Sequence, residues 1–245
     1  MSPITLTLLA LGIFAIAFLY SSAGQAGGTA YIAVMSLFGL APEVIRPTAL
    51  SLNILVASLA AFQFWRAGHF SWRLFWPFAL LATPCAFLGG YITLPARAFN
   101  VLIGLILLFS AVRLFQRPPA DVVATTPSRA TALGIGAGIG LVAGLSGTGG
   151  GVFLSPILVL RQWALARTAA AVSALFILMN SIAGLAGNLS STRQFPPYAL
   201  WFLALAGAGG ALGSYAGSRR LDPTVVKRVI AFVLVVAGVR LLLTM

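Results

Sequence analysis

The chain is a succession of ten apolar runs separated by short polar joints, and this pattern constrains its fold more than any other feature. The runs fall at about 4–22, 29–40, 47–65, 72–94 and 97–115, then at 130–145, 149–162, 168–188, 197–217 and 224–244. Several approach the roughly 20 residues that cross a bilayer as a helix, whereas the second run of each set is too short to cross comfortably. Because 60% of the 245 residues are hydrophobic and 7% are charged, a water-soluble fold could not bury the apolar surface. We therefore predict an all-α polytopic membrane protein with about eight to ten transmembrane segments.

The few polar residues narrow the possible functions. The formal net charge is +12, but the basic residues stand singly at the ends of apolar runs, so membrane topology explains them better than nucleic-acid binding does. The chain has one cysteine (Cys85), one histidine (His69) and three acidic residues. We therefore expect no metal site and no cofactor. The expected partners are a small anionic substrate, the lipid bilayer and, as an open possibility, a second copy of the chain in a homodimer.

Two glycine-rich breaks interrupt the apolar sequence. The clearer one is Gly147-Thr148-Gly149-Gly150-Gly151, and Gln25-Ala26-Gly27-Gly28-Thr29 is a fainter copy in the first half. Close helix packing explains the alternate glycines of residues 134–140 well, but consecutive glycines do not form one helix face. A glycine turn followed by an apolar helix instead presents backbone N–H groups and the positive end of the helix dipole, which favour an anion.

A few neutral polar side chains could complete such a site. Ser173 and Asn180 lie two turns apart on one face of a predicted helix, and Ser51 and Asn53 lie on the corresponding helix of the first half. Hydrogen bonds to neighbouring helices are an equally good explanation for the serines, whereas a carboxamide within a membrane is harder to satisfy by chance. The predicted substrate-binding residues are Gln25, Gly27, Gly28, Thr29, Ser51, Asn53, Gly147, Thr148, Gly149, Gly150, Gly151, Ser173 and Asn180.

The two halves of the chain share a series of short matches in the same order, which indicates a duplication. The matching sets are Arg46, Ser51 and Ser58 with Arg167, Ser173 and Asn180; Leu88-Gly89-Gly90-Tyr91 with Leu212-Gly213-Ser214-Tyr215; and Val112-Arg113-Leu114 with Val239-Arg240-Leu241. We expect one membrane repeat at 1–116, a cytoplasmic linker at 117–129 and a second membrane repeat at 130–245. Segments 1 and 2 of each repeat are predicted to be glycine-broken helices, either half-helices or re-entrant ones.

The basic residues predict how the chain crosses the membrane. If the chain turns back at each glycine break, 11 of the 15 Lys and Arg residues fall on one side and 4 on the other; a single broken crossing would give 7 and 8. The positive-inside rule favours the first arrangement. It places the linker in the cytoplasm and both termini outside. Because five passes per repeat is an odd number, the two repeats would have inverted topology, a common plan in secondary transporters.

The sequence resembles the TauE/SafE family of sulfite and organosulfonate exporters over nearly its whole length. The resemblance rests on the two glycine motifs with Pro156 beyond the second, the Arg-then-Ser helix, the Leu-Gly-x-Tyr segment, and the closing Arg113 and Arg240. It implies a non-enzymatic secondary transporter of the bacterial inner membrane that exports sulfite or a short organosulfonate. The first glycine motif departs from the pattern, since it has fewer glycines and its short helix lacks a proline.

Two other functions are compatible with parts of the sequence. The same fold could take up thiosulfate or another small anion, or let it flow as through a channel. Gly144-Leu145-Ser146-Gly147 also has the G-x-S-G form of a membrane-embedded serine hydrolase. A serine nucleophile needs a base within hydrogen-bonding reach. The only histidine, His69, is predicted to lie in a loop, which makes the hydrolase the weakest reading.

Overall fold

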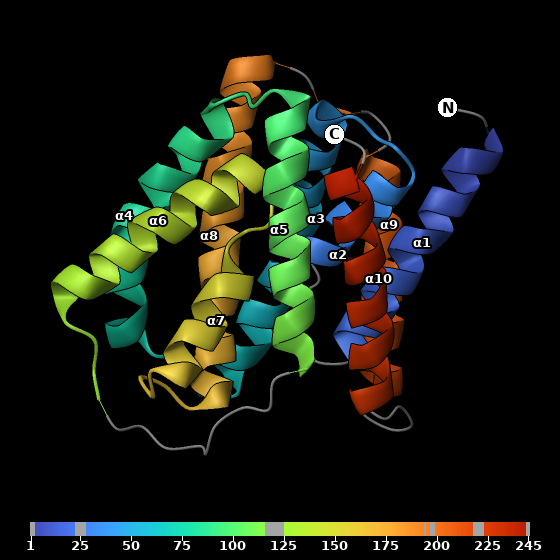
Figure 1. Ribbon diagram of the computed structural model, residues 1–245. Helices are drawn as coiled ribbons and strands as arrows, with labels where there is room; N and C mark the ends of the chain where they lie inside the picture. The colour runs from blue at the N-terminus through green and yellow to red at the C-terminus, as the bar shows by residue number, and fades with distance from the viewer. Residues whose placement is uncertain are drawn as a thin grey trace. The chain divides into compact units, whose positions relative to one another are not determined.

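The structure is a computed structural model that describes residues 3–22, 28–115, 125–193, 195–196, 199–217 and 223–243. Within these ranges the chain forms helices and no strands, as predicted. The ten helices are α1 (Pro3–Ser22), α2 (Gly28–Leu37), α3 (Pro42–Arg66), α4 (Trp72–Tyr91), α5 (Ala96–Phe115), α6 (Arg129–Ser146), α7 (Gly151–Leu160), α8 (Ala166–Thr192), α9 (Ala199–Gly217) and α10 (Pro223–Leu243) (Figure 1).

Five helices within the described ranges are long and apolar enough to cross a membrane: α3, α4, α5, α6 and α8. The chain is therefore a multi-pass membrane protein. Helices α2 and α7 have only 10 residues each, which corresponds to about 15 Å, half of a bilayer's hydrocarbon thickness. The short second segment of each predicted set is thus a short helix in the structure.

One predicted boundary is wrong in a way that matters. The apolar run at 47–65 predicts a helix that begins at its proline, but α3 begins at Pro42 and continues through Pro47. Arg46 consequently lies inside the helix, where it is 4% exposed, instead of in a loop. Glu43 lies in the first turn of the helix and is exposed. The other segments agree with the helices to within four residues at either end.

The chain divides into two compact units, and each takes helices from both halves of the sequence. The first unit comprises residues 1–56, 94–116 and 195–245, and the second comprises residues 57–93 and 117–194. Each unit has its own hydrophobic core. Tyr31 and Phe202 are among the fully buried side chains of the first core, and Phe78 and Phe176 among those of the second.

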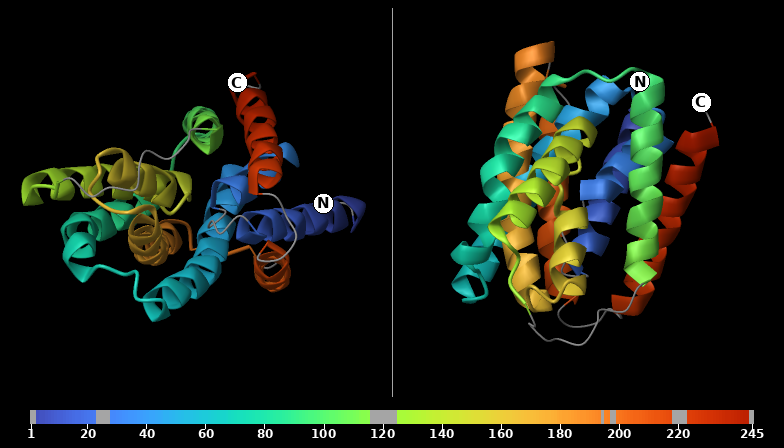
Figure 2. Two further views of the ribbon diagram at one scale, coloured as in Figure 1. Left: turned by 90° about the horizontal axis from the view of Figure 1, so that it is seen from below. Right: turned by 60° about the vertical axis from the view of Figure 1, so that its left-hand side comes forward.

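In the second unit, glycines bring helix backbones into direct contact. A Cβ on Gly140 of α6 would lie 2.6 Å from the Cα of Ala82 on α4, and one on Gly144 would lie 2.7 Å from the backbone nitrogen of Gly90. On α8, Gly184 lies equally close to Gly90, so α4 contacts both α6 and α8 through its backbone (Figure 2). Small residues allow this approach between membrane helices.

The glycines of residues 134–140 divide into two faces. Gly136 and Gly140 lie against the α4 backbone, so the prediction that they serve packing is confirmed. Within the part of the chain that the structure describes, a Cβ on Gly134 or on Gly138 would have nothing within 4 Å, so the same prediction is wrong for these two. Residues two apart on a helix point in nearly opposite directions, which explains the alternation.

In the first unit, α2 runs back alongside α1. The hydroxyl of Tyr20, near the end of α1, lies 3.3 Å from that of Thr29, at the beginning of α2. Gly12, farther back on α1, lies next to Val34, near the end of α2. The two helices are therefore antiparallel, as the turn-back arrangement requires. At the far end of α2, Arg240 of α10 donates a hydrogen bond to the carbonyl of Leu37, where the helix dipole favours a cation.

Candidate functional site

The second glycine motif is a sharp turn that ends one helix and begins the next. Gly147 has φ 84° and donates its N–H to the Ala143 carbonyl, which closes α6 in the left-handed way that glycine favours. Gly149 and Gly150 have φ 74° and 85°, conformations that other residues rarely adopt. Three left-handed glycines in four residues therefore reverse the chain within one short turn, and all of residues 147–151 are buried.

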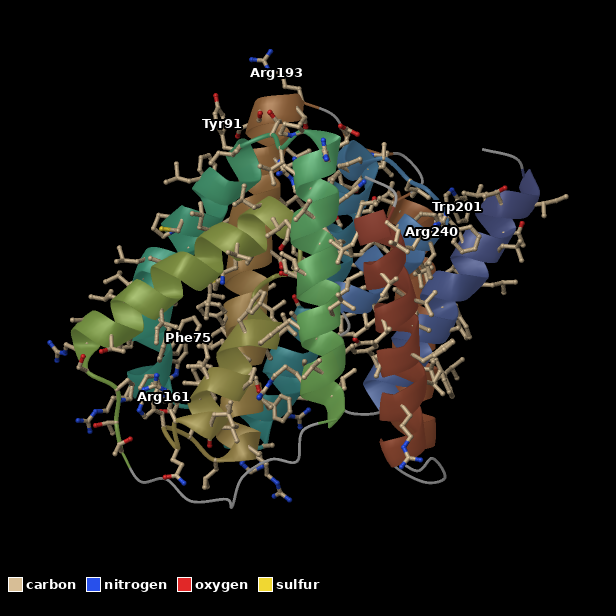
Figure 3. The ribbon with its side chains drawn as sticks, in the orientation of Figure 1. Phe75, Tyr91, Arg161, Arg193, Trp201 and Arg240 are labelled. Atoms are coloured by element: carbon tan, nitrogen blue, oxygen red, sulfur yellow. The ribbon has the colours of Figure 1, made fainter. Side chains whose placement is uncertain are left out.

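The turn lies against the middle of the longest helix in the second unit. A Cβ on Gly151 would lie 2.6 Å from Cγ1 of Ile177, which lies well inside α8. Figure 3 shows Tyr91 and Arg193, which mark the ends of α4 and α8, at one end of this unit, with Arg161 and Phe75 toward the other. Since Arg161 follows α7, this helix runs opposite to α4 and α8 and begins about halfway along α8 (Figure 1). The chain turns back at the glycine motif, as predicted.

The beginning of α7 carries backbone donors that have no acceptor. The N–H groups of Gly149, Gly150 and Gly151 donate to no residue that the structure describes. The first N–H groups of any helix lack partners within the helix, and they carry about half a positive charge between them. Buried and unpaired, each would cost on the order of 1–3 kcal/mol, so a polar ligand at this position is favoured.

Hydrogen bonds of Ser146 and Thr148 stabilise the turn. The Ser146 hydroxyl donates to the Val142 carbonyl at 2.6 Å, so its oxygen accepts from the Thr148 hydroxyl at 2.9 Å and from the Thr148 N–H at 3.3 Å. Both donors of Thr148 are thereby used inside the turn. Thr148 is a predicted ligand, but its hydroxyl and N–H both bind Ser146 and so hold the shape of the turn. Neither donor is available for the predicted contact with a ligand.

Asn180 has the properties expected of a ligand-binding side chain. It is 1% exposed, and neither its Nδ2 nor its Oδ1 has a hydrogen-bond partner among the described residues. It lies on the α8 face that also carries Ser173, Ile177 and Gly184, because these residues are spaced by three, four and seven. Ile177 contacts Gly151, and Gly184 contacts α4 at Gly90, which packs against Gly144 of α6. Asn180, between them, therefore faces the turn that joins α6 to α7.

Two serines on α8 resemble Asn180 in burial and lack of partners. Ser173 is 4% exposed and Ser181 is fully buried, and neither hydroxyl has a partner among the described residues. Ser173 is a predicted ligand, and its carbonyl lies 3.7 Å from where a Cβ on Gly151 would be. Ser181 was not predicted. The only sequence feature that marks Ser181 as a candidate is its position next to Asn180.

The predicted residues of the first half that the structure describes, Gly28, Thr29, Ser51 and Asn53, lie in the first unit. Gly28 begins α2, and both it and Thr29 are buried. Ser51 and Asn53 are buried on α3, but residues two apart cannot both face one ligand, and the Ser51 hydroxyl donates to the Pro47 carbonyl at 2.8 Å. Gln25 and Gly27 lie outside the residues that the structure describes.

The structure separates the two residues that a serine hydrolase would need. His69 precedes α4, whereas Gly144, next to Ser146 in the sequence, packs against Ala86 near the other end of α4. The 15 residues from Ser71 to Ala86 correspond to about 22 Å of helix. The Ser146 proton, moreover, is donated to a backbone carbonyl. A Ser–His pair is therefore not formed in this arrangement.

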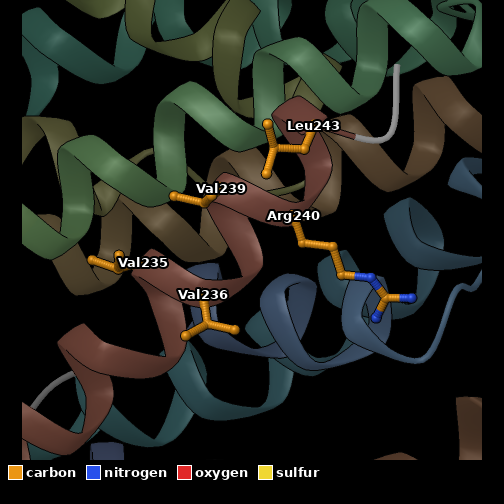
Figure 4. Close-up of a pocket in the computed structure, with 5 residues that line it drawn as sticks. All are labelled: Val235, Val236, Val239, Arg240 and Leu243. Carbon is orange, nitrogen blue, oxygen red and sulfur yellow. The ribbon is translucent and has the colours of Figure 1, made fainter.

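A shallow surface hollow on α10 has no features of a binding site. Its lining residues are Val235, Val236, Val239, Arg240 and Leu243, all from one helix (Figure 4). Arg240 directs its guanidinium away from the four apolar side chains, toward α2, where it binds the Leu37 carbonyl. The hollow is therefore an apolar side of one helix.

Broken short helices, buried neutral donors and several apolar spans define a membrane transporter. The comparisons with known proteins agree. Residues 8–241 match the family described as Sulfite exporter TauE/SafE, and the chain belongs to this family. A relative from Sinorhizobium fredii, named probable membrane transporter protein y4hK, is 41% identical over 239 residues, which cover 96% of this chain and 97% of the relative. No solved structure matches the chain.

Proposed function

We propose that this transporter exports a small sulfur oxyanion, sulfite or a short organosulfonate, from the cytoplasm across the inner membrane. The observation that carries the proposal is the beginning of α7. Three buried N–H groups there have no acceptor among the described residues, and the unpaired amide of Asn180 lies on the α8 face that contacts this turn through Ile177. Such a set of neutral donors binds an anion through hydrogen bonds and the helix dipole. Family membership supports the choice of sulfur oxyanions.

The neutrality of the site fits a substrate that must also leave. No charged side chain in the described part of the second unit is buried, and its arginines are exposed. A buried Arg would bind the anion with a strong charge-assisted pair, whereas N–H groups and a carboxamide bind it more weakly. Weak binding allows release on the other side of the membrane, which an exporter requires.

We also propose that the two sequence halves are inverted repeats and that the two glycine motifs are equivalent positions in them. The helix lengths run 20, 10, 25, 20 and 20 residues in α1–α5 and 18, 10, 27, 19 and 21 in α6–α10. The fourth helix of each half packs extensively against the first helix of the other half: α4 packs on α6, and α9 packs on α1. Two equivalent repeats would produce this pairing. In this arrangement both chain termini are external.

The anion's own charge is the proposed driving force. Carriers driven by protons commonly use an embedded Asp, Glu or His, and no such side chain is buried in the described part of the chain. Asp121 and Asp222 lie outside the described residues. When the inside is ~100 mV negative, expelling one negative charge is favourable by about 2.3 kcal/mol, which corresponds to roughly 50-fold in concentration.

Sulfite efflux from liposomes tests the proposal. Liposomes with reconstituted protein are loaded with sulfite, and a potassium gradient with valinomycin sets an inside-negative potential without a pH gradient. We expect efflux that accelerates with the potential, a loss of at least about tenfold in Asn180→Leu, and no change in Ser190→Ala. Ser190 is a suitable control because it is exposed on the same helix and its hydroxyl donates to the Ala186 carbonyl. Efflux no faster than from empty liposomes would refute transport of sulfite.

A further inference from the structure

The chemistry of Asn180 restricts the ligand beyond its being an anion, provided that the proposed function holds. A carboxamide offers two donors on Nδ2 and an acceptor on Oδ1, and neither atom has a partner among the described residues. The N–H groups of Gly149, Gly150 and Gly151 add three more donors. A fully deprotonated oxyanion has only acceptors. It can pair with every donor of the site, but it leaves the Oδ1 of Asn180 without a hydrogen bond.

An acceptor left unpaired at this depth weakens binding. Asn180 is 1% exposed, so its Oδ1 cannot turn toward bulk solvent. A buried polar group that loses its partner carries its full desolvation cost, and sites built around such a group reject ligands that lack the matching donor. A ligand that brings its own O–H group satisfies Nδ2, the N–H groups and Oδ1 together.

The charge of the site sets a second restriction. The positive end of the α7 dipole amounts to about half an elementary charge, and no charged side chain is buried in the described part of the second unit. One negative charge is matched approximately by this dipole, whereas a second would be buried without compensation. A ligand with an added ammonium group is disfavoured for the same reason, because no buried carboxylate accompanies Asn180.

We propose that the site between the α6–α7 turn and Asn180 selects a singly charged anion that carries its own hydroxyl donor. A hydroxysulfonate and a singly protonated sulfur oxyanion both have this chemistry. Sulfonates without a hydroxyl bind more weakly, and dianions and zwitterionic aminosulfonates bind more weakly still.

Two sulfonates that differ by one hydroxyl test the inference without any change of pH. Ethanesulfonate and 2-hydroxyethanesulfonate are titrated into the purified full-length protein by calorimetry, with sulfate and 2-aminoethanesulfonate as charge controls. We expect the hydroxylated sulfonate to bind about tenfold more tightly than ethanesulfonate. In Asn180→Leu this ratio should fall to about one, and in Ser190→Ala it should be unchanged.

The outcomes separate this inference from the proposed function. Equal affinity for the two sulfonates in the unmodified protein would overturn the donor requirement while leaving anion binding intact. Sulfate binding as tight as that of the hydroxylated sulfonate would overturn the charge requirement. A ratio that persists in Asn180→Leu would show that another group accepts the hydroxyl proton, and it would also refute the assignment. If none of the four ligands binds, the inference falls, whereas sulfite efflux from liposomes still decides the proposed function. Because the first comparison uses the unmodified chain, the test does not depend on a variant that folds.

Discussion

Replacing Gly140 with alanine should force α6 away from α4, whereas the same change at Gly138 should not. A Cβ at Gly140 would lie 2.6 Å from the Cα of Ala82 and closer still to the Ala82 carbonyl oxygen. Carbon atoms in contact lie about 3.5–4.0 Å apart, so the helices must separate by roughly 1 Å. Overpacking of this kind costs about 1–3 kcal/mol. At Gly138 the new methyl would meet no described atom within 4 Å.

Both substitutions gain the same ~0.5–1 kcal/mol of helix propensity, so the difference between them isolates the packing cost. For a chain of this size the difference corresponds to an unfolding temperature roughly 2–12 °C lower for Gly140→Ala than for Gly138→Ala. The single cysteine provides the assay, because Cys85 lies on α4, three residues beyond Ala82. Cys85 is half-buried, so a thiol-reactive fluorogenic dye added during a heating ramp reports unfolding of α4 as a rise in the rate of labelling. Equal unfolding temperatures for the two variants would refute the backbone contact between α6 and α4.

Three further predictions concern the buried serines, the hydrogen bond at the end of α2 and the orientation of the chain in the membrane. Ser173→Ala should weaken sulfite binding several-fold and Ser51→Ala should leave it unchanged, as measured by calorimetry, because the Ser51 hydroxyl is already bonded to its own helix. Arg240→Gln should lower the unfolding temperature by the equivalent of about 0.5–1 kcal/mol, since the Leu37 carbonyl loses a charged partner at the end of α2; an unchanged temperature would contradict the contact. A reporter fused at residue 122 should be cytoplasmic and one at the C-terminus external, and a cytoplasmic C-terminus would refute the inverted topology.

The helices and the turn were predictable because hydrophobic runs and glycine clusters are strong local signals. The predicted boundary at α3 is wrong because Pro47 lies inside the helix and does not begin it. The actual start has its own signal, since proline favours the first helical position and an acidic residue favours the first turn, as at Pro42 and Glu43. A helix that begins at Pro42 contains Arg46.

Other features depend on contacts that no sequence pattern encodes. The pairing of Thr148 with Ser146 uses donors that looked available for a ligand, and it follows from the turn's three-dimensional geometry. Gly150 looked like a residue that admits a ligand, yet a Cβ there would lie 2.8 Å from Cγ2 of Ile139, in the core. Valine at Gly150 would thus disturb packing, which makes Asn180 the sharper probe of binding.

The contact of α4 with α6 and α8 also determines when this protein can fold during its synthesis. Helix α4 is complete at Tyr91, but α6 ends 55 residues later at Ser146 and α8 ends 101 residues later at Thr192. At about 5–20 residues per second, the ribosome needs roughly 3–11 s to supply the first partner and 5–20 s to supply the second. During that interval the backbone surface around Ala82, Ala86 and Gly90 has only lipid or the insertion machinery to cover it. The first half of the chain must therefore wait in the membrane for the second.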